Sequence, residues 1–518
     1  MLDLIYVGNI SEDSIISNEK GELHKCFGGS TIYSSYASKC VSSNLKVGVI
    51  GNACIKYKNE LEANGIKFLG KIMENNTQFY INEVTNECFG TNYNMVSYEG
   101  SEKIATRHLH VSFRKGINVE QILNNKLILY NTLSIDVMIH SVKEMIPIII
   151  KYLEKIDIIF CNMDEYQIIK EYINNKIKVV ITNNSKPIVL IENEKIFIQK
   201  IENVDNIVSV TGAGDSFIGG FLGEFLLSNN LKKAIQMGMK TSQKSILQYG
   251  PLKECKFEID NAKSTIKEIP RKIIVIGNSC AGKSTFVKYY KALFDIYTEI
   301  DDIEPLKEVF KLDDMIRENT FNLYTIEKDI QYCFDIVEEY KSDITHINFY
   351  TKKAIVGDGH TILRPVLWDK ILKYSLNKYK GNNVIIQFAR GKDETYEKEY
   401  NQNVYLRNLL TIDEKICLDS KTIIINLQAD LEKRLIRNEE RKLNGGHYVE
   451  EETMKKIYEK DIFEFSIDNE VSFLSLNGKK ILVYNLNNNV IYDKNELQQY
   501  MKNEIINIIK YYNKYMED

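Results

Sequence analysis

The sequence predicts an α/β protein of two domains, each built around a mostly parallel sheet. At 518 residues the chain is too long for one ordinary core. An apolar strand that ends at a glycine opens each half, at residues 4–9 (LIYVGN) and 272–278 (KIIVIGN). We place the boundary in the charged segment between Pro251 and Pro270, which gives domains 1–266 and 267–518.

Short apolar runs rich in β-branched residues alternate with helical patterns in both halves, as expected for successive βαβ units. The clearest predicted strands cover residues 156–160, 178–182, 354–357, 383–388 and 422–427. The tail at 495–516 has helical spacing and is predicted to be a packing helix. Binding sites are expected at the carboxyl ends of the parallel strands.

The composition is that of an ordinary soluble globular protein, 44% hydrophobic and 27% charged, with a formal net charge of −4. This charge provides no electrostatic footprint for nucleic acid or for an anionic membrane. The nine cysteines form no CxxC pair, which indicates reduced thiols rather than a zinc site or a disulfide framework. We find no signal peptide and no apolar run of membrane-spanning length, and therefore expect a cytoplasmic protein.

A glycine-rich motif, VTGAGDSFIGGFL, occupies residues 210–222. Apolar residues at helical spacing follow it, so Gly212, Ala213 and Gly214 are predicted to lie at a helix N-terminus. Unpaired amides and the helix dipole make such a turn an anion site. Asp215 in the first turn could accept the proton of a substrate hydroxyl while the amides stabilise a transferred phosphoryl group. The alternative is a plain glycine turn in which Asp215 is only a helix-start charge.

Through this motif, the first half of the chain resembles the PfkB/ribokinase family of small-molecule kinases. Other segments of this half follow the motifs of that family in the same order. The resemblance implies substrate binding by Asp13 and by the di-glycine loop at 28–33, and a magnesium- and phosphate-associated N-x-x-E at 162–165. It implies these site residues: Asp13, Gly28, Gly29 and Tyr33 for substrate, Asn162, Glu165, Gly212, Ala213 and Gly214 for ATP and Mg²⁺, and Asp215 for catalysis. Taken alone, Asp13 would be better interpreted as an exposed turn acid and Glu165 as a helix-start charge, and it is the order of the motifs along the chain that favours the functional interpretation.

The chain departs from the family pattern at three places. Ser209 stands where an aspartate is usual, Tyr33 replaces a frequent asparagine, and TNNSKP at 182–187 lacks both glycines of the nucleotide loop. Tyr33 argues against a ribokinase-like grip on a furanose, and the altered nucleotide loop leaves open whether this half is active.

A second motif, GNSCAGKST at 277–285, matches G-x-x-x-x-G-K-[ST] and lies between an apolar strand and a helical pattern. The loop that contains Gly277 and Gly282 is predicted to hold β-phosphate on its amides. Lys283 is expected to bridge the phosphates, and Ser284, followed by Thr285, to hold Mg²⁺. The sequence therefore predicts a second site for ATP.

Three further sets of charged residues are candidates for this second site. Asp301 and Asp302 follow a predicted strand and are candidate substrate ligands, although a loop or cap pair is the alternative. Asp358 ends the 354–357 strand at a position suited to Mg²⁺. Arg434 and Arg437 share a helical face that could supply positive charge to phosphates, with a solvated charged face as the alternative.

The second half resembles adenylate-kinase-like small-molecule P-loop kinases, and GGHYV at 445–449 is similar to zeta-toxin-type members. The resemblances together imply a bifunctional ATP- and Mg²⁺-dependent kinase acting on small molecules. One alternative keeps a single catalytic half, and another makes the second half a nucleotide-driven switch or toxin-like module.

For the first half we predict an uncharged sugar, cyclitol or nucleoside as acceptor, because no basic cluster accompanies Asp13 or Gly28. Segments 17–26 and 78–97 lie where family members carry a β-stranded lid, through which a homodimer is possible.

Overall fold

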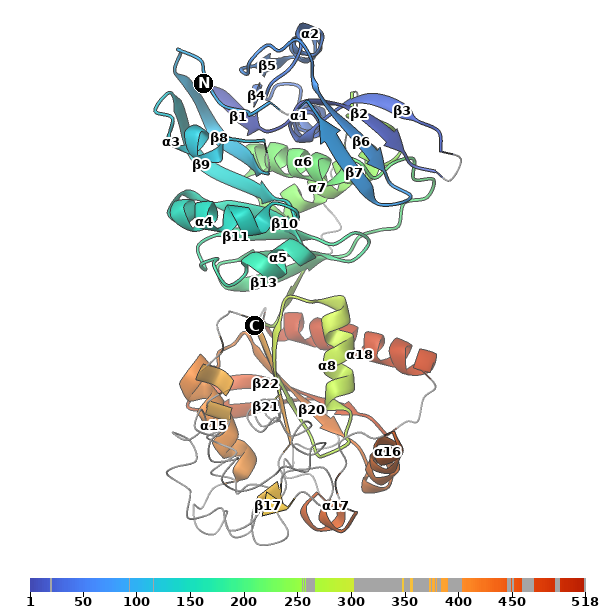
Figure 1. The fold of residues 1–518 in the computed structure, drawn as a ribbon. Helices are drawn as coiled ribbons and strands as arrows, with labels where there is room; N and C mark the ends of the chain where they lie inside the picture. Colours follow the sequence, from blue (N-terminus) through green and yellow to red (C-terminus); the bar gives the residue numbers. More distant parts are fainter. Residues whose placement is uncertain are drawn as a thin grey trace. The chain divides into compact units, whose positions relative to one another are not determined.

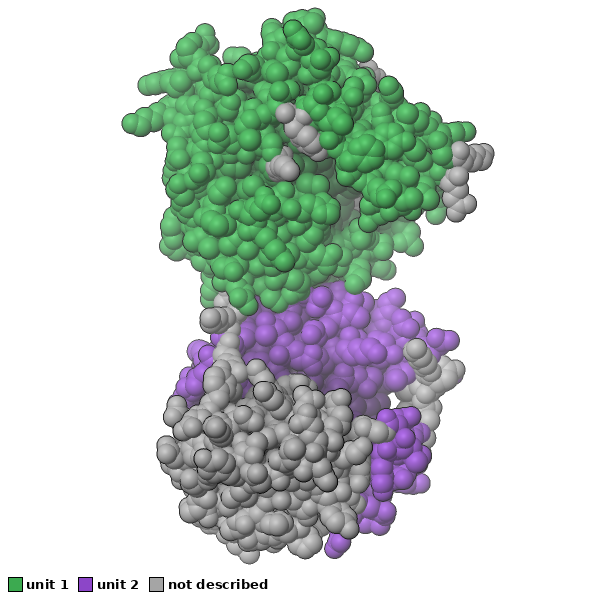
Figure 2. All heavy atoms as spheres, in the orientation of Figure 1, with its two compact units in different colours: residues 1–267 green, residues 268–518 purple. Residues whose placement is uncertain are grey.

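The computed structural model separates the chain into two compact units, Met1–Lys267 (unit 1) and Glu268–Asp518 (unit 2) (Figure 2). Each unit has its own cluster of buried apolar side chains. The structure describes residues 1–18, 21–92, 94–114, 116–253, 255, 257, 266–301, 347–348, 355–356, 372–373, 375–377, 379, 383–389, 403–444, 449, 451–458, 470–489 and 494–516.

The main sheet of unit 1 places its strands in the order β13-β12-β11-β10-β9-β8-β1-β4-β5 (Figure 1). Its strands from β11 to β5 pair in parallel, whereas β12 and β13 are antiparallel additions at one side. The strands are β1 (Leu2–Val7), β4 (Val47–Ile50), β5 (Ile66–Phe68), β8 (Ile104–Phe113), β9 (Ile128–Val137), β10 (Ile158–Asn162), β11 (Lys178–Thr182), β12 (Ile188–Glu192) and β13 (Lys195–Gln199). Strand β14 (Lys267–Ile269) spans the division between the units.

Helices α1, α6 and α7 pack closely because glycines of α6 face their partners. A Cβ on Gly219 would lie 2.1 Å from the Ser34 carbonyl oxygen of α1, and one on Gly220 would lie 2.1 Å from Thr241 Oγ1 of α7. The helices of unit 1 are α1 (Ser30–Val41), α2 (Ile55–Ala63), α3 (Val119–Asn124), α4 (Val142–Tyr152), the 3₁₀ turn η1 (Leu153–Lys155), α5 (Met163–Ile169), α6 (Ala213–Ser228) and α7 (Leu231–Ser245).

A second sheet in unit 1 has the strand order β3-β2-β6-β7, and we name it the lid sheet (Figure 1). Its strands are β2 (Ser11–Ile16), β3 (His24–Gly28), β6 (Thr77–Asn82) and β7 (Glu87–Thr91). Strand β2 pairs antiparallel with β3 and parallel with β6, and β6 and β7 form a hairpin. The two predicted lid segments therefore meet in one sheet.

Unit 2 contains a sheet of order β16-β19-β15-β20-β22-β21, parallel except for the β21–β22 pair (Figure 1). The central strands are continuous apolar runs because both faces are buried. The strands are β15 (Lys272–Ile276), β16 (Thr298–Asp301), β19 (Val384–Phe388), β20 (Thr422–Gln428), β21 (Val471–Leu476) and β22 (Lys479–Asn487), with a separate pair β17 (Ile347–Asn348) and β18 (Ile355–Val356). The helices that the structure describes as whole elements are α8 (Lys283–Leu293), α15 (Val404–Ile416), α16 (Leu431–Leu443), α17 (Glu451–Ile457) and α18 (Lys494–Met516).

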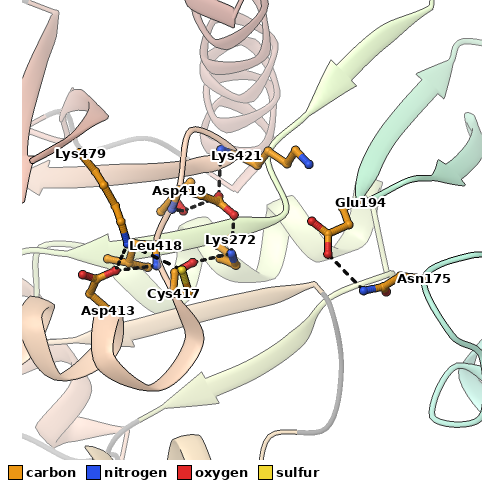
Figure 3. Close-up of polar contacts among 10 residues, drawn as sticks. Asn175, Glu194, Lys272, Asp413, Cys417, Leu418, Asp419, Lys421 and Lys479 are labelled. Atoms are coloured by element: carbon orange, nitrogen blue, oxygen red, sulfur yellow. Dashed lines mark hydrogen bonds and ion pairs between the residues drawn. The ribbon is translucent and has the colours of Figure 1, made fainter. Parts of the chain in front are cut away.

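Polar contacts hold the segment between α15 and β20, at the start of the central strands (Figure 3). Asp413 Oδ1 accepts hydrogen bonds from the Leu418 amide at 2.8 Å and from Lys479 Nζ at 2.9 Å. Lys272 Nζ, at the start of β15, donates to Asp419 Oδ2 at 2.8 Å. These contacts fix the amino ends of β15 and β20, the ends opposite to those at which the sequence predicts a site.

The predicted α/β class is confirmed, with mixed rather than wholly parallel sheets. The tail is a helix, as predicted, and it buries Met501, Ile505, Ile508 and Tyr512. Among the described residues, none of the helices combines the length and hydropathy needed to cross a membrane.

Candidate functional site

The loop before α6 presents backbone amides at the start of that helix. Gly212 is the N-cap residue with φ 78°, and a Cβ there would lie 2.3 Å from the Tyr33 ring. A Cβ on Gly214 would meet nothing within 4 Å, so the space beside this turn is open. The predicted glycine–alanine–glycine turn thus lies at a helix N-terminus, a position that suits an anion.

Asp215 lies in the first turn of α6, with 20% of its side chain exposed. The Arg114 guanidinium donates to Asp215 Oδ1 at 3.4 Å and also donates to Asp136. Burial raises the pKa of Asp215, the Arg114 charge opposes that rise, and the Asp136 charge adds to it. Burial acts in the same direction on Asp136, but Arg114 and His110 outweigh it and hold the Asp136 pKa below its usual range.

Two buried histidines extend this network away from Asp215. His110 Nε2 lies 3.3 Å from Asp136 Oδ1, and His110 Nδ1 shares a 2.8 Å hydrogen bond with Ser134 Oγ. Ser134 Oγ also lies 2.7 Å from His108 Nε2. Burial, helped by His110, lowers the pKa of His108 to about 3, so His108 is neutral.

Arg114, Asp136 and the two histidines were not predicted from the sequence. The signal for Arg114 and the histidines is the alternation of polar residues at 106, 108, 110, 112 and 114, whereas Asp136 lies on the neighbouring strand β9. Residues two apart share one face of a strand. Buried polar side chains need hydrogen-bond partners. A row of them on one face of a strand as buried as β8 therefore indicates a polar network at this place.

Asp13 lies within β2 and is 2% exposed. It accepts hydrogen bonds from Ser11 Oγ at 2.7 Å and from the Tyr33 hydroxyl at 3.3 Å. Burial raises its pKa to about 6 although these hydrogen bonds oppose the rise. A Cβ on Gly28 would lie 1.9 Å from Asp13 Oδ2, and one on Gly29, with φ 97°, would lie 2.4 Å from a backbone oxygen. The absence of a Cβ at Gly28 therefore leaves room for the Asp13 carboxylate, and its absence at Gly29 leaves room for the Asn9 backbone.

Tyr33 joins the two parts of this site. Its side chain is 2% exposed, its hydroxyl donates to Asp13, and its ring lies against Gly212. In this state a ligand hydroxyl must compete with the Tyr33 hydroxyl for Asp13.

Asn162 and Glu165 form a capping box at the start of α5. Asn162 Oδ1 accepts from the Glu165 amide at 2.9 Å, and Glu165 Oε2 accepts from the Asn162 amide at 2.7 Å. Glu165 is 6% exposed, and burial raises its pKa to about 7. Arg114 and Asp136 are close enough to act on that carboxyl electrostatically, so the N-x-x-E segment borders the Asp215 network.

In unit 2, residues 277–282 connect β15 to α8, so the second motif has the strand–loop–helix context that was predicted. Lys283 Nζ donates to the carbonyl oxygens of Gly277 at 2.9 Å and Asn278 at 3.0 Å. Gly282 is the N-cap of α8 with φ 106°. Thr285 follows Ser284 in the first turn of that helix.

Ser284 Oγ donates to Gln387 Oε1 at 3.1 Å, and Gln387 Nε2 donates to Glu299 Oε1 at 2.8 Å. Gln387 and Glu299 lie on β19 and β16, next to the loop, and the sequence analysis did not name them. Asp301 is the last residue of β16 and pairs in register with Gln387. Asp302 and Asp358 lie outside the described residues.

The two arginines of α16 have different surroundings. Arg437 donates to the Cys280 carbonyl oxygen of the loop at 3.4 Å and to the Asn488 carbonyl oxygen at 2.6 Å. Arg434 is 2% exposed, and its Nε donates at 2.8 Å to the Ala429 carbonyl oxygen just before α16. Arg437 thus contacts the loop directly.

Residues 16–255 match the family described as pfkB family carbohydrate kinase, so this segment is a PfkB-family domain within the longer chain. The match starts after Asp13 and ends before the unit 2 loop. A search of curated proteins gives no match.

Solved structures similar to this chain include three kinases. A ribokinase from Cryptococcus neoformans var. grubii has 16% identity and a TM-score of 0.39, over 49% of this chain and 97% of its own. A Methanocaldococcus jannaschii nucleoside kinase has 16% identity and a TM-score of 0.40, over 49% and 95%. An aminoimidazole riboside kinase from Salmonella enterica has 16% identity and a TM-score of 0.40, over 48% and 95%.

Proposed function

We propose that unit 1 is an ATP-dependent kinase that phosphorylates a hydroxyl group of a small molecule. The observation that carries this proposal is Asp215, which directly follows the Gly212–Gly214 turn and is held by Arg114. The acceptor hydroxyl oxygen bonds to the γ-phosphorus while the bond from that phosphorus to the β–γ bridging oxygen breaks. Asp215 takes the hydroxyl proton, and the amides at the start of α6 stabilise the charge on the phosphoryl oxygens.

Asp13 is the proposed ligand for hydroxyls of the acceptor. Asp13 is buried, and each of its two carboxylate oxygens already accepts a hydrogen bond from a hydroxyl group. A hydroxyl of the ligand could take the place of the Tyr33 hydroxyl and donate the same kind of hydrogen bond. The side chains that hydrogen-bond to Asp13 and Tyr33 in the described part of the chain belong to Ser11, Cys26 and to these two residues themselves, and none carries a positive charge. This favours an uncharged sugar, cyclitol or nucleoside over a sugar phosphate.

Glu165 is the proposed protein ligand for Mg²⁺ in unit 1, because hard oxygen donors are what this ion prefers. The Asp136 and Arg114 charges act on the Glu165 carboxyl, which places it beside the Asp215 network. Among the described residues, no group of three His, Cys, Asp or Glu side chains could hold a metal ion, so the remaining ligands would come from the phosphates of ATP and from water. Arg114 contributes fixed positive charge to the same place.

Unit 2 is proposed to be a second phosphotransferase of the P-loop type, acting in the same pathway. Support comes from the loop at the carboxyl end of β15, from Lys283 folded over that loop, and from Arg437 beside it. Ser284 is the proposed Mg²⁺ ligand, with Asp358 as a further candidate. The chain would then be a bifunctional kinase.

The test incubates the full chain with ATP and a cell extract of metabolites and identifies phosphorylated products by mass spectrometry. Asp215→Asn should abolish one product and Lys283→Ala another. If Asp215→Asn changes neither, unit 1 is not a kinase and the alternative of one catalytic unit replaces the proposal. ATP hydrolysis that depends on a ligand, without any phosphorylated metabolite, would favour a regulatory module.

A further inference from the structure

One carboxylate oxygen from the lid sheet collects the donors of the loop that precedes α6. Glu83 Oε1 accepts from Ser209 Oγ at 2.7 Å, from the Val210 amide at 3.0 Å, from the Thr211 amide at 2.8 Å and from Thr211 Oγ1 at 2.6 Å. Four donors converge on a single charged oxygen, and we name this group the Glu83 contact. Hydrogen bonds to a charged acceptor are stronger than those between neutral groups.

The lid sheet fixes the position of Glu83. Its amide donates to the Ile16 carbonyl oxygen at 2.9 Å, which ties it to the end of β2, and it follows directly after β6. Asn82 Oδ1 accepts from the amides of Val84 and Thr85 and so shapes the turn. Because Asp13 lies in β2, Glu83 and Asp13 belong to the same sheet.

The loop on the other side of the contact leads directly into the anion turn. Thr211 is followed by Gly212, which lies against Tyr33, and by the amides of Ala213 and Gly214. A shift of Ser209–Thr211 therefore displaces the turn beside Asp215. Without Glu83 the Val210 amide loses its acceptor, and the Thr211 amide keeps only the 3.2 Å hydrogen bond to Ser209 Oγ. The backbone hydrogen bonds from the Ser209 amide to the Ile246 carbonyl oxygen at 3.3 Å and from the Ala213 amide to the Val210 carbonyl oxygen at 3.2 Å would remain.

We propose that Glu83 is a positioning residue through which the lid sheet orders the phosphate-binding turn of unit 1. The turn takes its active geometry when the lid sheet lies over the site, so that binding of the acceptor beside Asp13 and assembly of the anion turn are coupled. The effect on catalysis rests on the proposed kinase function, whereas the ordering of the loop does not.

The geometry also predicts a replacement. Ser209 Oγ lies within hydrogen-bonding reach of both Glu83 and the Thr211 amide. An aspartate at 209 would place a carboxylate within the loop itself, where it can accept from the Thr211 amide without help from the lid sheet. Ser209→Asp should therefore rescue a chain that lacks Glu83.

The experiment compares the full-length protein with Glu83→Ala, Glu83→Gln and the double variant Glu83→Ala/Ser209→Asp. Glu87→Ala is the matched control, because Glu87 lies on the same hairpin and accepts from Thr85 Oγ1 at 2.8 Å instead of from the loop. Amide hydrogen exchange is measured without ligand, and kcat and KM are measured with the acceptor found by the metabolite screen.

In Glu83→Ala we expect exchange at Val210 and Thr211 to accelerate by about tenfold or more. Amides of the turn between β6 and β7, residues 83–86, which we name the lid turn, should also exchange faster, and kcat should fall more than KM rises. In Glu83→Gln the exchange rates and kcat should lie between those of the wild type and Glu83→Ala, since a neutral amide oxygen accepts a hydrogen bond more weakly than a carboxylate does. The double variant should regain protection at Thr211 and most of kcat, but not protection of the lid turn, and Glu87→Ala should match the wild type.

Unchanged exchange at Val210 and Thr211 in Glu83→Ala overturns the proposal, whatever the activity. If the double variant protects the Thr211 amide but does not regain kcat, the proposed effect of loop ordering on catalysis is wrong. A wild-type chain with a protected loop but no phosphorylated product refutes the kinase function and leaves the ordering of the loop by Glu83 standing.

Discussion

At the scale of single residues, the charge state of Asp215 depends on Arg114. Asp136 and Asp215 are carboxylates that repel each other across a buried space, and Arg114 bonds to both. A guanidinium stays protonated throughout the usual pH range, so it stabilises the ionised form of both acids. The base proposed for phosphoryl transfer is thus maintained by a residue that itself performs no proton transfer.

Replacement of Arg114 by methionine should lower kcat/KM by about 10²-fold, because Asp215 loses the charge that opposes its raised pKa. The acid limb of the pH–rate profile should move to higher pH, since the Asp215 pKa rises further. Arg107→Met is the control: Arg107 lies on β8, the strand that Arg114 directly follows, and it bonds to Asp3 and to the Leu226 carbonyl oxygen instead of to Asp215. An unmoved acid limb in Arg114→Met would show that Arg114 does not act through Asp215.

Asp13 gives a pH dependence of stability with a defined sign. Its pKa is about 6 in the folded protein against 3.8 for an ordinary aspartate, so between these values the folded state holds a proton that the unfolded state has lost. Stability therefore falls as pH rises through this window, by on the order of 3 kcal/mol in total. In Asp13→Asn that dependence is removed.

The measurement is hydrogen exchange of β2 and β6 amides at pH 5 and pH 7.5, corrected for intrinsic rates. Between pH 5 and pH 7.5 the wild type should lose stability relative to Asp13→Asn, because only the wild type has the Asp13 carboxyl that ionises in this range. Asp205→Asn, at an exposed carboxylate, is the control. A difference that is independent of pH would contradict the raised pKa of Asp13.

At the scale of elements, the features that the sequence predicts are those encoded by a local pattern of residues. The apolar strands, the glycine turn before α6 and the loop before α8 are each encoded within about a dozen consecutive residues. Glu83 could not be found in this way, because 126 residues separate it from Ser209. Arg114 and Asp136 likewise meet only after β8 and β9 pair, and the single clue was the polar alternation within β8.

Helix α6 also depends on close packing. Gly219→Ala places a Cβ 2.1 Å from the Ser34 carbonyl oxygen, a backbone atom that moves only with α1. We expect a loss of about 1–3 kcal/mol in the stability of unit 1. In Gly223→Ala the new Cβ would lie 3.3 Å from Val41 side-chain atoms, so the same change in the same helix should cost far less. Urea unfolding compares the two, and equal losses would refute the packing argument.

At the scale of the whole molecule, the two loops that we propose to bind phosphate are built on different physical plans. In unit 1 the donors lie at the start of α6 and are held by side chains from the lid sheet and from β8. In unit 2 the loop leaves the carboxyl end of a central parallel strand, with Lys283 folded onto it. Each unit has its own core, and on this ground the two units should respond independently to local damage.

Asp413 provides the test of that independence. Its side chain is 6% exposed, and it accepts from the Leu418 amide, from Lys479 Nζ and from Asn477 Nδ2 at 2.7 Å. Burial tends to raise its pKa, but these donors outweigh burial and lower it, so the stability they contribute is lost as pH falls through that lowered value. Asp413→Ala removes an acceptor from the Leu418 amide, from Asn477 Nδ2 and from Lys479 Nζ, of which Lys479 keeps a contact with Cys417 Sγ, and should cost unit 2 about 2–3 kcal/mol. In hydrogen exchange near pH 7, amides of β15, β20 and β22 should exchange about tenfold faster or more, while those of β8 and β9 stay unchanged. Equal acceleration in both units would mean that they unfold as one cooperative body.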